Sequence, residues 1–168
     1  RSIGILDRVR ASPLSTRDVV MGAAITVMVT GMIAATLVTV LSTVVFGASW
    51  GRPLDVAVIM FAFVVSVAGL LGLVVGFART EPQADSWTSL MAFGFGVLAG
   101  SFFGGTSLPG VLGVIGTLTP NGAAMRALIE AGPGGEGLAG VWYLLVWMFA
   151  IGVGGVVVGG LLLNRRLR

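Results

Sequence analysis

The stretch that decides the fold is VVMGAAITVMVTGMIAATLVTVLSTVVF, residues 19–46, which contains no charged side chain. A helix needs about 20 predominantly apolar residues to cross the ~30 Å hydrocarbon core of a bilayer. Three further apolar stretches follow it, at residues 56–77, 87–103 and 138–163, and none of them contains a charged residue either. We therefore expect an all-α integral membrane protein with four transmembrane helices.

The composition of the chain excludes several classes of function. The sequence is 56% hydrophobic and 10% charged, with a mean hydropathy of +1.03, whereas soluble domains have about 25% charged residues. It has no cysteine and no histidine, which excludes disulfides and thiolate metal sites and removes the commonest general base. The glycine-rich runs lie inside apolar stretches, so they are not phosphate-binding loops. We expect no catalytic, cofactor or metal site, and an intramembrane enzyme is the least favoured class.

The arginines predict how the chain lies in the membrane. All ten basic residues are Arg, and cytoplasmic loops carry the excess of basic residues. With four spans both termini lie on one side, together with eight of the arginines: Arg1, Arg8, Arg10, Arg17, Arg79, Arg165, Arg166 and Arg168. Only Arg52 and Arg126 lie on the other side. We expect both termini in the cytoplasm, and the arginines orient the spans rather than form a nucleic-acid surface.

The segment at residues 109–135 is apolar but is interrupted by Pro109, Pro120 and many glycines. Neither of its apolar pieces is long enough to cross a membrane. We predict two short re-entrant or interfacial helices at the outer face, with a break at Thr119 to Asn121, because Thr and Asn favour N-cap and turn positions. An ordinary hydrophobic outer loop is the alternative.

Glycines recur at every fourth position at Gly96, Gly100 and Gly104, which places them on one face of a regular helix. Small residues let helix backbones approach closely in lipid. This face is either a dimer contact or translocation surface, or it packs within one subunit. The pairs at positions 72 and 76 and at 155 and 159 have the same spacing, and there we favour packing within the subunit.

Polar side chains in the predicted helices are few. Thr36, Thr39 and Thr43 fall on one face of the first span, where their hydroxyls either line a pathway or, as we favour, bond the carbonyl four residues back. Arg126 and Glu130 are spaced to pair on one helix. A local surface pair is favoured there over a gate or a substrate contact.

Three stretches, in their order along the chain, resemble a known family. They are GILDRVRASPLSTRDVVMG (residues 4–22), LLGLVVGFARTEPQADS (70–86) and GFGVLAGSFFGGTSLPGVLGVIGTLTPNGAAMRAL (94–128). Taken in order, the chain resembles the membrane subunit of ABC-2 type exporters, a permease family that includes bacterial multidrug and antibiotic-efflux transporters. The resemblance covers nearly all of residues 1–168, as part of a single transmembrane domain that runs from the coupling helix to the C-terminus, and two further spans are expected upstream.

The resemblance gives the basic N-terminal segment a role. We predict that residues 1–17 contain a short amphipathic helix at the cytoplasmic surface, which from the residues alone either docks on a partner or is anchored by anionic lipid. The resemblance favours docking as a coupling helix on an ATPase subunit, through the following residues: Ile3, Leu6, Asp7, Arg8, Arg10, Ser12 and Pro13.

The function implied is that of a membrane permease in an ATP-driven exporter of the bacterial cytoplasmic membrane. The permease is not itself an enzyme: ATP and Mg²⁺ bind the separate ATPase subunit, and a second permease subunit, identical or different, completes a dimer. We expect a hydrophobic or amphipathic cargo, such as a drug, an antibiotic or a lipid-like molecule. Export of a polysaccharide or lipid-linked glycan, and a membrane assembly protein without transport, remain the alternatives.

Overall fold

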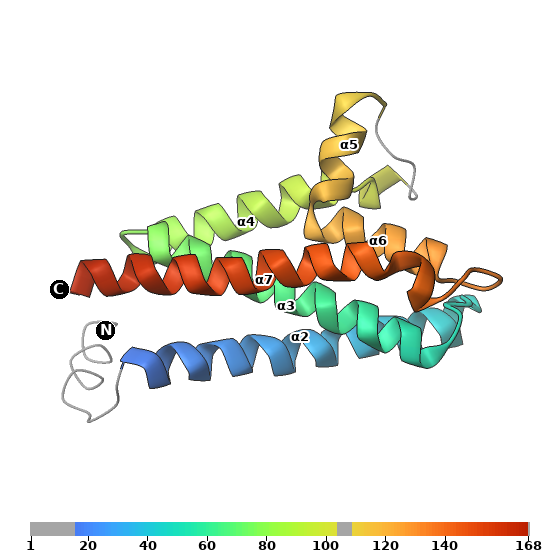
Figure 1. The fold of residues 1–168 in the computed structure, drawn as a ribbon, viewed down its shortest axis with the longest axis horizontal. Coiled ribbons are helices and arrows are strands. Elements are labelled where there is room, and N and C mark those ends of the chain that lie inside the picture. The colour runs from blue at the N-terminus through green and yellow to red at the C-terminus, as the bar shows by residue number, and fades with distance from the viewer. Residues whose placement is uncertain (1–15, 104–108, 168) are drawn as a thin grey trace.

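The structure is a computed structural model that describes residues 16–103 and 109–167 (Figure 1). Every element in this part of the chain is a helix, which confirms the prediction of an all-α protein. The elements are α2 (Thr16–Phe46), α3 (Pro53–Phe77), α4 (Glu81–Leu98), the 3-10 turn η1 (Ser101–Phe103), α5 (Val111–Leu118), α6 (Pro120–Glu130) and α7 (Leu138–Leu167).

Three of the described helices are long and apolar enough to cross a membrane. They are Ala24–Phe46 of α2, the whole of α3, and Leu138–Leu162 of α7. At ~1.5 Å per residue, α3 is roughly 37 Å long, which exceeds the ~30 Å hydrocarbon core. Helix α4 is not among them, because its 18 residues begin with a polar run that includes Glu81 and Asp85.

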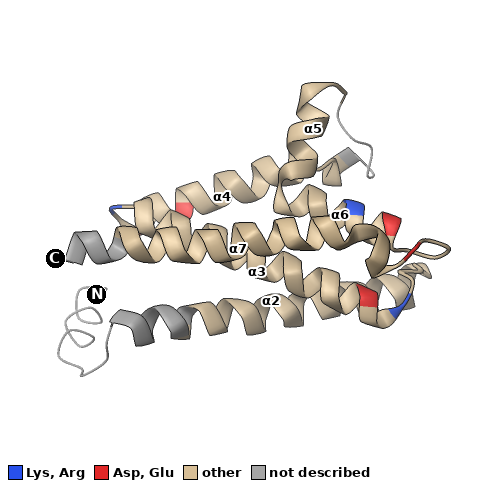
Figure 2. Cartoon of the chain, viewed as in Figure 1, with Lys and Arg blue, Asp and Glu red and all other residues tan. Residues whose placement is uncertain are grey.

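The long helices lie side by side, with α4 running lengthwise beside α3 (Figure 1). The start of α2, the end of α7 and the connection between α3 and α4 lie at one end of the bundle. The opposite end, called the α6 end below, holds α6 and residues 47–52 and 131–137. Charged residues gather at these two ends and leave the middle uncharged (Figure 2), as expected for helices whose middles face hydrocarbon.

Helices α3 and α7 form the most extensive contact of the fold, and glycines make it. A Cβ atom added to Gly69 or Gly155 would overlap the backbone of the facing helix, at Gly152 and Gly69 respectively. The same overlap occurs between Gly159 and the backbone of Gly72. The favoured interpretation of these glycines, packing within one subunit, is therefore confirmed.

The buried core lies toward the α6 end, where α3, α6 and α7 meet. Ile59 of α3, Ala127 of α6, and Val141 and Met148 of α7 are all fully buried. Alanines dominate the α6 side of this cluster, so the short helix lies close against both long helices. The core thus fixes α6 to the α3–α7 pair.

Helix α4 ends at Leu98, before the predicted end of the third span at Phe103. Gly100 has a φ of +73°, a left-handed conformation that only glycine adopts readily. Gly96 lies on the helix and faces the ring of Phe102 in η1. Gly96 and Gly100 therefore do not share a helix face, which corrects the prediction from their spacing; Gly104 lies outside the described residues.

Helix α2 packs chiefly against α3. At one point of this contact Gly31 faces the side chain of Val64. Away from it, large apolar side chains are more than half exposed, among them Leu37, Val44 and Phe46. Such a surface is stable only in lipid or against another apolar surface.

Candidate functional site

The segment between η1 and α7 forms two short helices, α5 and α6, that meet at one residue. Thr119 ends α5 and caps the start of α6: its hydroxyl donates to the Gly116 carbonyl (2.6 Å) and accepts from the Gly122 amide (3.1 Å). Pro120 follows at the first helical position, where its missing N–H costs nothing. Thr119 is 7% exposed, so this corner is a buried, hydrogen-bonded turn.

Glycines allow this corner to lie in close backbone contact with its neighbours. A Cβ on Gly122 would overlap the carbonyl of Gly116, and a Cβ on Gly116 would overlap the carbonyl of Leu98 at the end of α4. On the adjoining side, the Asn121 amide nitrogen donates to the hydroxyl of Ser101 in η1 (2.9 Å). The sequence predicted a break between two helices at these positions. The residues of this break also make the contacts that join α4, α5 and α6.

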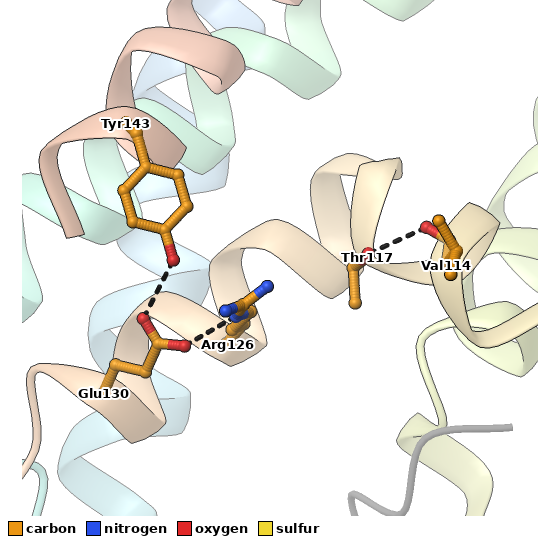
Figure 3. A network of polar contacts seen from close by, with 5 residues as sticks. All are labelled: Val114, Thr117, Arg126, Glu130 and Tyr143. Carbon is orange, nitrogen blue, oxygen red and sulfur yellow. Dashed lines mark hydrogen bonds and ion pairs between the residues drawn. The ribbon is translucent and has the colours of Figure 1, made fainter. Parts of the chain in front are cut away.

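An ion pair at the α6 end joins α6 to α7. Arg126 Nε and Glu130 Oε1 lie 2.6 Å apart, and the hydroxyl of Tyr143 donates to Glu130 Oε2 (3.1 Å; Figure 3). The guanidinium also lies over the Tyr143 ring, 5.9 Å from its centre. The hydrogen bond to Glu130 raises the pKa of Arg126 above its ordinary value. The pair predicted as local is thus a three-residue network that reaches the next long helix.

A second hydrogen bond ties α5 to the same helix. The indole nitrogen of Trp147 donates to the carbonyl of Leu118 (2.8 Å), one of the last carbonyls of α5, which have no partner within their own helix. Tyr143 and Trp147 lie one turn apart on α7. One face of α7 therefore holds both short helices.

A pocket of about 330 Å³ lies between the end of α4, α5 and α6. Its lining includes the polar side chains of Arg126, Glu130 and Thr117 and apolar side chains such as Leu98 and Ile129. Thr117 donates to the Val114 carbonyl (2.8 Å; Figure 3). The pocket therefore has a mixed polar and apolar lining.

The remaining predicted residues are placed as follows. Pro109 is exposed and precedes α5, whose N-cap is Gly110. The predicted coupling residues lie outside the described part of the chain: Ile3, Leu6, Asp7, Arg8, Arg10, Ser12 and Pro13.

Thr36, Thr39 and Thr43 of α2 were expected either to line a pathway or to bond the carbonyl four residues back. Thr39 donates to the carbonyl of Ala35 (2.8 Å), and Thr43 donates to that of Thr39 (2.9 Å), as favoured. These two and Thr36 also line a hollow of about 410 Å³ between α2 and α3. The hydroxyl protons of Thr39 and Thr43 are therefore used within the helix.

One buried acidic residue was missed by sequence reasoning, which placed the second span at 56–77 with no charge inside. The helix begins earlier, at Pro53, and Asp55 is 6% exposed. Its Oδ2 atom is buried without a hydrogen-bond partner and lies against Gly137, beside which the guanidinium of Arg52 also lies. A proline at the first helical position followed by an acidic first turn is the signal that would have found it.

A sequence profile of the ABC-2 type transporter family matches residues 1–131. No curated protein and no solved structure matches the chain. The profile covers the N-terminal segment and helices α2 to α6. Together with three helices able to cross a bilayer, it identifies a multi-pass membrane protein of a transporter family. The resemblance carried by the sequence motifs is confirmed: the chain belongs to the ABC-2 type transporter family.

Proposed function

We propose that the chain is the permease part of an ATP-driven exporter, which moves a hydrophobic or amphipathic molecule out across the cytoplasmic membrane. The observation that carries the proposal is the family match over residues 1–131, on a chain whose described part consists of helices. ATP and Mg²⁺ bind a separate ATPase subunit in this proposal, and a second permease subunit completes the transporter.

The proposal includes four membrane crossings. Helix α4 is the fourth, although its polar first turns make it less hydrophobic than the other three helices. Its 18 residues span about 27 Å at ~1.5 Å each, close to the ~30 Å hydrocarbon core. Its position alongside α3 (Figure 1) supports a crossing.

The distribution of arginine supports the orientation. Arg17 lies at the start of α2, Arg165 and Arg166 lie at the end of α7, and Arg79 lies between α3 and α4. Arg52 precedes α3 and Arg126 belongs to α6, at the opposite end. The excess of basic residues marks the cytoplasmic side. The α6 end is then the outer face, and the network of Arg126, Glu130 and Tyr143 lies there.

The residues that line the hollows support a hydrophobic or amphipathic cargo. Those between α3 and α4 and between α2 and α3 are lined mostly by apolar side chains, with no charged residue among them. A hydrophobic or amphipathic molecule enters such a surface without stripping a charge of its water. The exposed apolar face of α2 supports a contact with the second permease subunit.

The test is a pull-down of the complete protein, solubilised in mild detergent, against the ATPases of the cell. The variant reverses two charges of the predicted coupling helix, Arg8→Glu with Arg10→Glu. The matched control reverses Arg165 and Arg166, which we place on the same side of the membrane. We expect a stoichiometric ATPase with the native protein and with the control, and its loss with the first variant.

Two outcomes contradict the proposal in different ways. If no ATPase binds the native protein, the exporter function is wrong and a membrane assembly protein becomes the better explanation. If both double variants lose the ATPase equally, the coupling role of residues 1–17 is wrong, because cytoplasmic charge in general would then explain the binding.

A further inference from the structure

Asp55 lies where two helices begin. Helices α3 and α7 run in the same direction, and both start at the α6 end of the bundle (Figure 1). Asp55 is in the first turn of α3. Its Oδ2 atom lies 2.8 Å from the position of a Cβ added to Gly137, the residue directly before the start of α7 at Leu138. One carboxylate therefore lies at the N-termini of both helices.

This position suits a negative charge. The N-terminus of a helix carries about half an elementary positive charge and N–H groups that have no partner within the helix. Because α3 and α7 are parallel neighbours, their two partial charges lie close together and repel each other. A carboxylate between them offsets this repulsion, which gives a physical reason for a buried acidic side chain at this point.

The bonding of this carboxylate is nevertheless incomplete. Oδ2 of Asp55 has no hydrogen-bond partner, and a buried charge without hydrogen bonds is costly. The Nη1 atom of Arg52 lies 3.9 Å from the same Cβ position on Gly137, and the side chain of Arg52 is exposed. The structure describes both residues, and they form no ion pair in it. A guanidinium thus lies near the carboxylate without bonding to it.

The surroundings indicate which group completes the bonding of Asp55. A metal ion is disfavoured, because two helix N-termini and the Arg52 guanidinium all carry positive charge there. The part of the chain that the structure describes also contains no group of three or more metal-ligating side chains. Arg52, in contrast, needs only rotations of its own flexible side chain, and a guanidinium can donate two parallel hydrogen bonds to a carboxylate.

We propose that Arg52 and Asp55 form a strap that closes over Gly137 at the start of α3 and α7. The structure shows the open form, with Arg52 exposed and Oδ2 of Asp55 unpartnered. In the closed form the guanidinium donates to Oδ2 and covers the last residue before α7. The proposal concerns the conformation of the chain and does not depend on transport.

Closure of the strap also acts on α6. Residues 131–137 connect α6 to α7, and at their start the backbone of Ala131 and Gly132 packs against Gly51. With Arg52 closed over Gly137, this connection is held to the start of α3 at both of its ends. Opening the strap leaves it held at one end only.

The test measures how fast individual arginines react with p-hydroxyphenylglyoxal, which modifies free guanidinium groups. It uses the complete protein in mild detergent, and mass spectrometry of its peptides follows each site with time. The exposed Arg79 is the reference. We expect Arg52 to react at least about five-fold more slowly than Arg79, the factor that ~1 kcal/mol of pairing gives. Asp55→Asn should abolish this protection.

Glu130→Gln is the matched control, because it makes the same exchange of a carboxylate for an amide in the ion pair of α6. It should raise the rate of Arg126 and leave that of Arg52 unchanged. Equal rates of Arg52 and Arg79 in the native protein would overturn the proposal, and this comparison stands even if Asp55→Asn fails to fold. A folded Asp55→Asn variant in which Arg52 stays protected would overturn it as well. Because ATPase binding is measured separately, these results do not bear on the exporter function.

Discussion

Replacing Gly155 by alanine should destabilise the α3–α7 contact, and the structure gives the reason. The three atoms nearest to the added Cβ are all backbone atoms of Gly69, each closer than 3.0 Å, a separation that real Cβ atoms essentially never show. Because no flexible side chain can move away, the helices themselves must separate. Overpacking of this kind costs about 1–3 kcal/mol.

The neighbouring glycine provides the control. A Cβ on Gly154 meets nothing within 4 Å, so Gly154→Ala adds the same methyl group to the same helix without a contact. Both variants gain the same helix propensity, ~1 kcal/mol over glycine. The difference between them therefore isolates the cost of the overlap, about 1–3 kcal/mol.

The assay is unfolding of the purified protein in mixed micelles with increasing sodium dodecyl sulfate, followed by far-ultraviolet circular dichroism. Gly155→Ala should unfold at a lower detergent fraction than Gly154→Ala. If the free energies of unfolding of the two variants agree within about 0.5 kcal/mol, the usual error of such comparisons, the backbone contact between α3 and α7 does not limit stability and our reasoning is refuted.

Three further predictions concern the α6 end, each measured by the same unfolding assay. Thr119→Ala removes the cap of α6 and should cost ~1 kcal/mol, whereas Thr119→Ser should retain most of it. Trp147→Phe removes the hydrogen bond to Leu118 and should cost about 0.5–1.5 kcal/mol; no loss would mean that α5 is held without it. Gly137→Ala should cost about 1–2 kcal/mol because its φ is +65°, and additionally because the methyl group meets Asp55; an unchanged stability would contradict that conformation.

The sequence predicted what local chemistry determines. The break at Thr119 follows from a threonine and a proline in adjacent positions, which cap and start a helix wherever they occur. The end of α4 was not predicted, because a glycine every fourth residue looks the same whether it lies on a helix face or, like Gly100, takes a positive φ that ends the helix.

Contacts between segments far apart in the chain could not be predicted from the sequence. Arg126 and Glu130 could be paired from their spacing, but Tyr143, which donates to Glu130, comes from another helix, and only the fold brings it close. The same holds for the facing glycines of α3 and α7. Their spacing indicated a face for close packing, whereas the choice between this subunit and another required the structure.

The glycine contact of α3 and α7 has a mechanical consequence. Where backbones touch, no side-chain rotamers are available to take up a shift, so these two helices can move only as one rigid frame. Contacts made through side chains, such as that of Gly31 with Val64, can slide and repack. In the described part of the chain a change of shape therefore falls first on α2, because α4 is itself held at its end by the backbone contact of Leu98 with Gly116.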